Sequence, residues 1–408
     1  MLARRVRARY NRGIMKKNPL LSLAFLAFLS AAPVPARAVE EPQITAPHAL
    51  LVDHDTGAVL FSRRATEFMV PASMSKLMTA YLLFEALKAG HISMDSEFTV
   101  SENAWKKGGS GTDGSTMFLK IGQKVSVSDL LRGIIVQSGN DACIVIAENM
   151  AGTEIKFAGA MNRKAGEIGL KNSVFRNSTG LPEVGHVMTA RDLVILTRAI
   201  IRDFPEYYPI FAEKDFVFNG ITQANRNPLL YADFPDGAVG DGVKTGHTER
   251  SGYGLVGAAR TRDGGRRLLM VINGLKSKAL RGAESAHLMA WGLNNFNNYN
   301  LFNAGEPIDR IKVHMGAADT VAVSSPAEVV ATLPRDSYHQ AVVKIKFFEP
   351  IAAPVAAGTK VGTAAVFHPE IEGRQEYDLV VSEDVPKAGF FKRVYLSARY
   401  WAAKFLAR

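Results

Sequence analysis

The feature that most constrains the fold is the apolar stretch within "PASMSKLMTAYLLFEALKAG". Between Leu77 and Leu87 the apolar side chains would surround a helix instead of forming one stripe along it. A helix that is apolar all round is normally buried. The sequence therefore predicts a domain built around this helix, in a chain of 408 residues that can hold two modest domains or one large domain with an appendage.

Two serines and a lysine head this helix, and their spacing distinguishes the serines. Ser73 and Lys76 are three residues apart and share one face of a helix, whereas Ser75 points elsewhere. A serine hydroxyl needs a base to take its proton. A lysine serves as that base only if burial or a second cation lowers its pKa from about 10.4. Ser73 and Lys76 are thus a candidate nucleophile and base.

Two further short motifs follow in the chain, "SGN" at 138–140 and "KTG" at 244–246. Lys244 would supply a second cation. Each motif also has an ordinary structural explanation, since Ser138 and Asn140 could cap and turn a helix and Lys244 could be a solvated strand residue. Ser-x-x-Lys alone arises by chance about once in a chain of this length. Three motifs in this order are much less expected by chance.

The remaining pattern predicts an α+β domain followed by a smaller all-β domain. A hairpin about "DHDTG" and extended runs after Gly240 flank a set of helices, for which Ser128 and Thr189 are predicted N-caps. Another helix is predicted over 282–299. We expect an antiparallel sheet closed by terminal segments and covered by helices. Short strands separated by turns predict a small β-sandwich over 306–386.

The N-terminal segment 1–38 has the layout of a secretory signal peptide, with a basic start, an apolar stretch and "ARA" before the predicted cleavage after Ala38. Its apolar stretch is shorter than the roughly 20 residues of a spanning helix. Met15 is an alternative start. This segment holds eight basic residues and no acidic one, so removing them reduces the formal net charge from +10 to +2. The sequence therefore gives little support to nucleic-acid binding.

The C-terminal segment 387–408 combines aromatic and aliphatic residues at helical spacing with basic residues and contains no acid after Asp384. This pattern favours an amphipathic helix at a membrane surface, although a helix docked on the protein itself is the alternative. Cys143 is the only cysteine, so no intramolecular disulfide can form. Its apolar surroundings favour a buried, inert thiol, and whether it has a function stays open.

With "NRN" at 225–227 and "RGAES" at 281–285, the three motifs resemble the low-molecular-mass penicillin-binding proteins, specifically serine-type D-alanyl-D-alanine carboxypeptidases. The resemblance implies a β-lactamase/transpeptidase-like catalytic domain over 39–305, which needs no metal or organic cofactor. It also implies peptidoglycan stem peptides as substrates and β-lactams as inhibitors. The expected location is the periplasmic face of the cytoplasmic membrane, after export.

The resemblance implies a role for each motif residue. Ser73 attacks the carbonyl between two terminal D-alanines, with Lys76 as general base. The other catalytic residues are Ser138, which relays a proton to the departing D-alanine, Asn140, which holds a substrate amide, and Lys244, which adds positive potential. The substrate-binding residues are Thr245 and Arg281 at the terminal carboxylate, Gly246 within the motif, and His247, whose backbone N–H forms an oxyanion hole with that of Ser73.

Two departures from the β-lactamase pattern favour the carboxypeptidases. Gly139 stands where that pattern has aspartate, and no "ExxLN" segment is present, since Glu183 in "GLPEVGH" does not fit its spacing. We therefore predict slow deacylation of penicillins. The alternatives are a D,D-endopeptidase, a β-lactamase or a non-catalytic cell-wall-binding scaffold. The balance of carboxypeptidase and endopeptidase activity, the oligomeric state and the role of the sandwich stay open.

Overall fold

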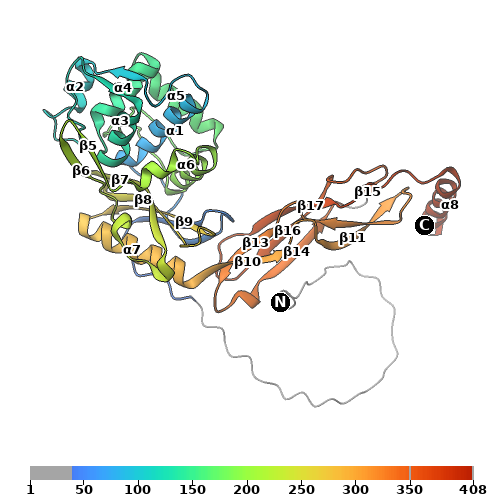
Figure 1. The fold of residues 1–408 in the computed structure, drawn as a ribbon. Helices are drawn as coiled ribbons and strands as arrows, with labels where there is room; N and C mark the ends of the chain where they lie inside the picture. Colours follow the sequence, from blue (N-terminus) through green and yellow to red (C-terminus); the bar gives the residue numbers. More distant parts are fainter. Residues whose placement is uncertain (1–38, 349–350, 407–408) are drawn as a thin grey trace. The chain divides into compact units, whose positions relative to one another are not determined.

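The computed structural model describes residues 39–348 and 351–406. The predicted signal peptide at 1–38 lies outside the described residues. Two compact units divide the chain between Asn294 and Asn295, and Figure 1 colours the first blue to gold and the second orange to red. The domain boundary expected at 305 falls later in the chain, beyond the first strand of the second unit.

The first unit is built on a five-stranded sheet in which all neighbouring strands are antiparallel. Strands from the beginning of the unit pair with strands from its end, which confirms the expected closure of the sheet by terminal segments. In spatial order the strands are β2 (Val59–Arg63), β1 (His48–Asp53), β9 (Arg267–Leu275), β8 (Gly252–Arg260) and β7 (Val239–Thr248).

Seven helices accompany the sheet, six in a cluster on one face and α7 on the other (Figure 1). They are α1 (Lys76–Lys88), α2 (Glu102–Gly108), α3 (Val127–Arg132), α4 (Asn140–Ala151), α5 (Glu154–Glu167), α6 (Ala190–Asp203) and α7 (Lys278–Asn295). Two small hairpins join the cluster, formed by β3 (Glu97–Thr99) with β4 (Lys124–Ser126) and by β5 (Asp215–Phe218) with β6 (Ile221–Ala224).

The pattern of buried side chains in α1 and β1 agrees with the position of each element between its neighbours. Helix α1 is buried around its axis, with Leu77, Leu83 and Phe84 at most 1% exposed, which confirms the predicted central helix. In β1, Leu50 belongs to the core shared with the helical cluster, whereas a Cβ placed on Gly292 of α7 would lie only 2.5 Å from Leu51 Cδ2. Successive side chains therefore pack against opposite layers, as strand geometry requires.

Two local predictions were wrong. The Ser126 hydroxyl, and not that of Ser128, caps α3 by accepting a hydrogen bond from the Asp129 N–H. The helix predicted over 282–299 ends at Asn295, and its last residues belong to strand β10 (Phe296–Phe302). Asparagine is a weak helix former, and pairing with strand β13 (Val329–Pro334) decides the conformation there. Thr189 caps α6, as predicted.

The second unit is the predicted all-β sandwich followed by a helix. β10 pairs with β13, while a six-stranded sheet has the order β14, β16, β17, β12, β11, β15. Residues of both sheets meet in one core that includes Val321, Leu333 and Leu379. The further elements are β11 (Pro307–His314), β12 (Thr320–Ser324), β13 (Val329–Pro334), β14 (Val342–Phe347), β15 (Ile351–Ala352), β16 (Lys360–Phe367), β17 (Gln375–Val381) and α8 (Phe390–Leu406).

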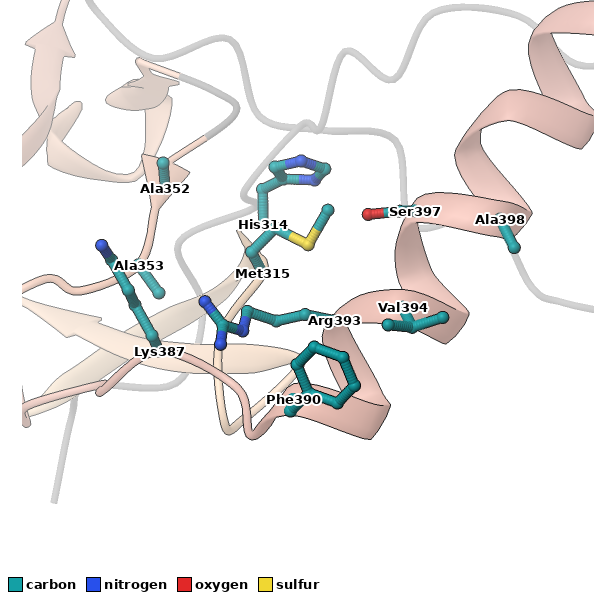
Figure 2. Close-up of a pocket in the computed structure, with 10 residues that line it drawn as sticks. All are labelled: His314, Met315, Ala352, Ala353, Lys387, Phe390, Arg393, Val394, Ser397 and Ala398. Atoms are coloured by element: carbon teal, nitrogen blue, oxygen red, sulfur yellow. The ribbon is translucent and has the colours of Figure 1, made fainter.

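The first turn of α8 is fixed to the sandwich. Lys392 Nζ donates to the Ala317 carbonyl and pairs with an Asp319 carboxylate oxygen, each at 2.8 Å. A groove of about 780 Å³ lies between the first turns of α8 and His314 and Met315. In Figure 2, Arg393 extends from α8 towards Met315, and Ser397 faces His314. Within residues 39–348 and 351–406, no helix combines the length and apolar character needed to cross a bilayer.

We expect Phe84→Ala to destabilise the first unit by about 3–5 kcal/mol, because a buried aromatic side chain leaves a cavity when it is truncated. The Phe84 ring stacks on Tyr207 with centroids 5.2 Å apart and also meets Phe211. Phe68→Ala is the matched control, since Phe68 is 62% exposed, and its effect should stay within about 0.5 kcal/mol. Urea unfolding of both variants beside the parent protein measures the difference; equal effects would contradict this packing.

Candidate active site

Ser73 lies in a 3₁₀ turn, Ala72–Ser75, that leads directly into α1. It is only partly buried and lines a cavity of about 830 Å³. The neighbouring Ser75 is fully buried, and its hydroxyl donates to the Ala72 carbonyl. Of these two serines, Ser73 is therefore the one that a bound molecule can reach.

Lys76 is the first residue of α1 and is 1% exposed. Its Nζ lies 2.9 Å from Ser73 Oγ, 2.7 Å from Asn140 Oδ1 and 2.7 Å from the Thr179 carbonyl oxygen. An amide oxygen and a backbone carbonyl can only accept hydrogen bonds, whereas a serine hydroxyl can also donate one. A neutral amine that donates to both acceptors therefore has its lone pair directed at the Ser73 hydroxyl.

The second motif meets Lys76 across the break between a π-helical turn, Gly133–Gln137, and α4. Ser138 adopts a left-handed conformation with φ of 62°, and Asn140 begins α4. Both side chains line the cavity. The next residue, Asp141, is fully buried and accepts hydrogen bonds from Thr116 Oγ1 and from the N–H groups of Met117 and Leu119.

The third motif lies on β7, the edge strand of the sheet beside the Ser73 turn. Thr245, Gly246 and His247 line the cavity, while Lys244 is 3% exposed behind them. A Cβ on Gly246 would lie 2.8 Å from the Pro71 carbonyl oxygen, which is closer than real contacts allow. Glycine at this position thus allows the strand to approach the nucleophile's turn.

Arg281 projects from α7 and also lines the cavity, although it is 4% exposed. Its guanidinium donates to the Arg226 carbonyl and lies 5.7 Å from the Tyr253 ring centroid. His247 stacks on the same ring at 3.8 Å. Every site residue predicted from the sequence is thus in or directly behind one cavity.

Burial determines the charge state of the two lysines. Burial, helped by the Arg226 cation, lowers the pKa of Lys76 to about 8, against the opposing effects of Cys143, Asp141 and Glu154. Burial and then the neighbouring Lys76 cation hold the pKa of Lys244 well below its ordinary value. Each amine therefore becomes neutral at a lower pH than a solvated lysine does. Burial also raises the pKa of the Cys143 thiol to about 12, consistent with an inert thiol.

Sequence reasoning missed the Thr179 carbonyl and the carboxylate of Asp141. The cavity rim is basic, with Lys107, Arg250 and Lys278 beside Arg226 and Arg281, and its acidic members are Asp113 and Glu249. Glu183 is exposed and accepts a hydrogen bond from Asn177. Over the described ranges, no group of three His, Cys, Asp or Glu side chains is arranged to hold a metal ion.

The chain belongs to the D-alanyl-D-alanine carboxypeptidase family, whose pattern it matches over residues 35–277, and it is a serine-type D-Ala-D-Ala carboxypeptidase. Residues 296–387 match the C-terminal domain of penicillin-binding protein 5. The chain is 36% identical to D-alanyl-D-alanine carboxypeptidase DacA of Escherichia coli K12, across 93% of this chain and 95% of that protein. It is 38% identical to DacC of the same strain, across 88% of each.

The solved structures agree with the sequence relatives. Penicillin-binding protein 5 from Haemophilus influenzae superposes with a TM-score of 0.77 at 36% identity, covering 86% of this chain and all of that one. DacD from Francisella tularensis superposes with a TM-score of 0.71 at 29% identity, covering 88% of this chain and 97% of that one. The fold predicted from the sequence is therefore confirmed, as is the carboxypeptidase activity.

A lysine base must be neutral, so we expect hydrolysis of a D-Ala-D-Ala peptide to rise with pH through about 8 and to be lost as the pH falls below it. Arg226→Gln removes a neighbouring cation and raises the pKa of Lys76, which moves the rising limb to higher pH. Arg250→Gln, at the rim, is the matched control and should leave the limb in place. Profiles of kcat/KM between about pH 6 and 10 measure both; an unmoved limb in Arg226→Gln contradicts this reasoning.

Proposed function

We propose that this carboxypeptidase removes the terminal D-alanine of peptidoglycan stem peptides through an acyl-enzyme on Ser73. The observation that supports it best is the set of partners around Lys76. Two of them are acceptors only, so the lone pair of the neutral amine is left for the Ser73 hydroxyl 2.9 Å away. This is the arrangement that a general base requires before a substrate binds.

In the acylation step, Lys76 takes the Ser73 hydroxyl proton while Oγ attacks the carbonyl carbon between the two D-alanines. The tetrahedral oxyanion forms against the backbone N–H groups of Ser73 and His247. The C–N bond then breaks, and the proton passes from Lys76 through the Ser138 hydroxyl to the departing amine. D-Alanine leaves, and an ester joins Ser73 to the shortened peptide. Water hydrolyses that ester and regenerates the hydroxyl.

Residues of β7 and α7 form one wall of the cavity, and we assign the orientation of the substrate to them. Thr245 and Arg281 would bind the terminal carboxylate, which is the only charge at the end of a D-Ala-D-Ala peptide. Charge complementarity supports this, since the guanidinium of Arg281 is desolvated and such a cation gains from an anionic partner. Lys244 adds a further donor behind Thr245, and Asn140 offers its amide NH₂ group to a substrate carbonyl while its oxygen faces Lys76.

Penicillins would acylate the same serine and stay attached. Glu183 is the candidate that the sequence offers for the deacylating glutamate of β-lactamases. It does not line the cavity, whose acidic residues are Asp113 and Glu249. Because Glu183 is not among the lining residues, it is not available to activate water against the ester, and we expect slow deacylation of penicillins. β-Lactams are therefore proposed as inhibitors of this enzyme.

We also propose that α8 holds the exported protein at a membrane surface, on the periplasmic side. Phe391 and Tyr395 are 87% and 64% exposed, although aromatic side chains are usually buried unless they have a partner. Basic residues share the helix with them, and no acid interrupts it. Such a helix gains apolar burial in the interface and attraction to anionic headgroups.

Benzylpenicillin should add one molecule to the protein from Val39 onward, and the adduct should disappear in Ser73→Ala. Intact-mass measurement before and after exposure tests this, with Ser75→Ala as the matched control that keeps the adduct. An adduct that persists in Ser73→Ala would contradict the assignment of the nucleophile. An adduct lost within minutes from the parent protein would instead indicate β-lactamase turnover.

Deletion of residues 390–408 should move the protein from the membrane pellet to the supernatant. Hydrolysis of D-Ala-D-Ala should persist, because the Ser73 site belongs to the other compact unit. In the full chain, Phe391→Ser should weaken binding to vesicles, whereas Phe348→Ser, which removes a 51% exposed ring elsewhere in the second unit, should not. Unchanged sedimentation of the deletion variant would contradict the proposed anchor.

A further inference from the structure

The loop at 177–181 supplies the acceptor that completes the environment of Lys76. Asn177 folds this loop on itself, since its Oδ1 accepts hydrogen bonds from the N–H groups of Thr179 and Gly180 and from the Thr179 hydroxyl. These contacts are internal and leave the loop's place in the protein undetermined. What holds the Thr179 carbonyl against Lys76 must lie outside the loop.

The first attachment is Thr79, one helical turn after Lys76 on α1. Its hydroxyl donates to the Ser178 carbonyl at 2.7 Å, and both residues are fully buried. The next carbonyl along the chain, that of Thr179, accepts from Lys76. Two consecutive carbonyls thus accept from two side chains on one face of the same helix, so that the loop is joined to α1 at two points.

The second attachment is Glu154, in the first turn of α5. Its Oε1 accepts from the Ser178 N–H at 3.1 Å and from the Ser178 hydroxyl at 2.7 Å. A charged acceptor makes stronger hydrogen bonds than a neutral one. Ser178 is therefore held on both sides, through its carbonyl by α1 and through its N–H and hydroxyl by α5.

We propose that Thr79 and Glu154 are positioning residues for acylation, because they fix Ser178 and with it the Thr179 carbonyl that orients Lys76. The proposal rests on the assignment of Ser73 and Lys76 made above. If the carbonyl moves away, one N–H of Lys76 loses its acceptor and the amine can rotate. Its lone pair is then no longer held toward the Ser73 hydroxyl. Small misplacements of this kind reduce rates strongly.

Neither residue lines the cavity, so neither is expected to contact substrate. The consequence is a specific pattern in the kinetics. Loss of either attachment should slow acylation and lower kcat while leaving KM close to that of the parent enzyme. A residue that only supports the fold would lower thermal stability without changing the acylation rate of the folded fraction.

Thr79→Val keeps the shape of the side chain and removes the donor. We expect the rate constant for acylation by benzylpenicillin, and kcat for a D-Ala-D-Ala peptide, to fall about tenfold or more, with KM within about twofold. Thr79→Ser keeps the hydroxyl and should restore most of the rate. Thr197→Val is the matched control, because Thr197 is equally buried in the same unit and its hydroxyl also donates to a backbone carbonyl.

Glu154→Ala should slow acylation in the same way, and Glu154→Gln, which keeps an acceptor oxygen, should be affected less. Thermal melting of every variant checks that the compared proteins are folded. Acylation at the parent rate in folded Thr79→Val overturns the proposal, as does an equal loss in Thr197→Val. If Ser73→Ala still forms the penicillin adduct, the assignment of the nucleophile fails instead, so the two failures are distinguishable.

Discussion

The active site depends on one buried amine and the oxygens that surround it. Keeping a lysine ammonium away from water costs several kcal/mol unless it is well paired, and here the pKa of Lys76 is lowered to about 8. Three separate segments contribute oxygen atoms that contact this amine: the Ser73 turn, the start of α4 and the loop at 177–181. The helical cluster over the sheet therefore has to place three chain segments within a few ångströms of a single nitrogen atom.

Residues that act through their own side chains could be found in the sequence. Ser73 and Lys76 follow from helical spacing, and the lysine of "KTG" follows from its place on a strand. The Thr179 carbonyl could not be found in this way, because every residue has a carbonyl and only the fold decides which one faces an amine. Asp141 follows "SGN" directly, yet nothing local distinguishes a carboxylate that organises a distant loop from one that faces solvent.

The fold could be predicted from the sequence where the burial of apolar side chains is the largest contribution to stability. The central helix is apolar on all sides, and its position in the core follows from that alone. Helix ends were less certain because the competing energies are small. Ser126 is followed three residues later by Asp129, the pattern of a capped first turn, whereas Ser128 is followed by Leu131. That contrast identifies the observed cap of α3. The conversion of 296–302 into a strand depends on a partner, β13, whose paired residues lie 27 (Phe302 with Val329) to 38 (Phe296 with Pro334) positions further along the chain.

Two glycines on opposite sides of the Ser73 turn have a thermodynamic consequence. Gly246 lets β7 approach the Pro71 carbonyl, and Gly180, with φ of 80°, lets the loop approach the Ala72 carbonyl, where a Cβ would lie only 2.0 Å away. Main chain of a strand and of a loop thus lies directly against the backbone of the nucleophile's turn. Main chain in a folded core has no rotamers left to freeze, so the entropy cost of fixing the serine is already met when the protein folds. The binding of a substrate beside Ser73 therefore loses less conformational entropy.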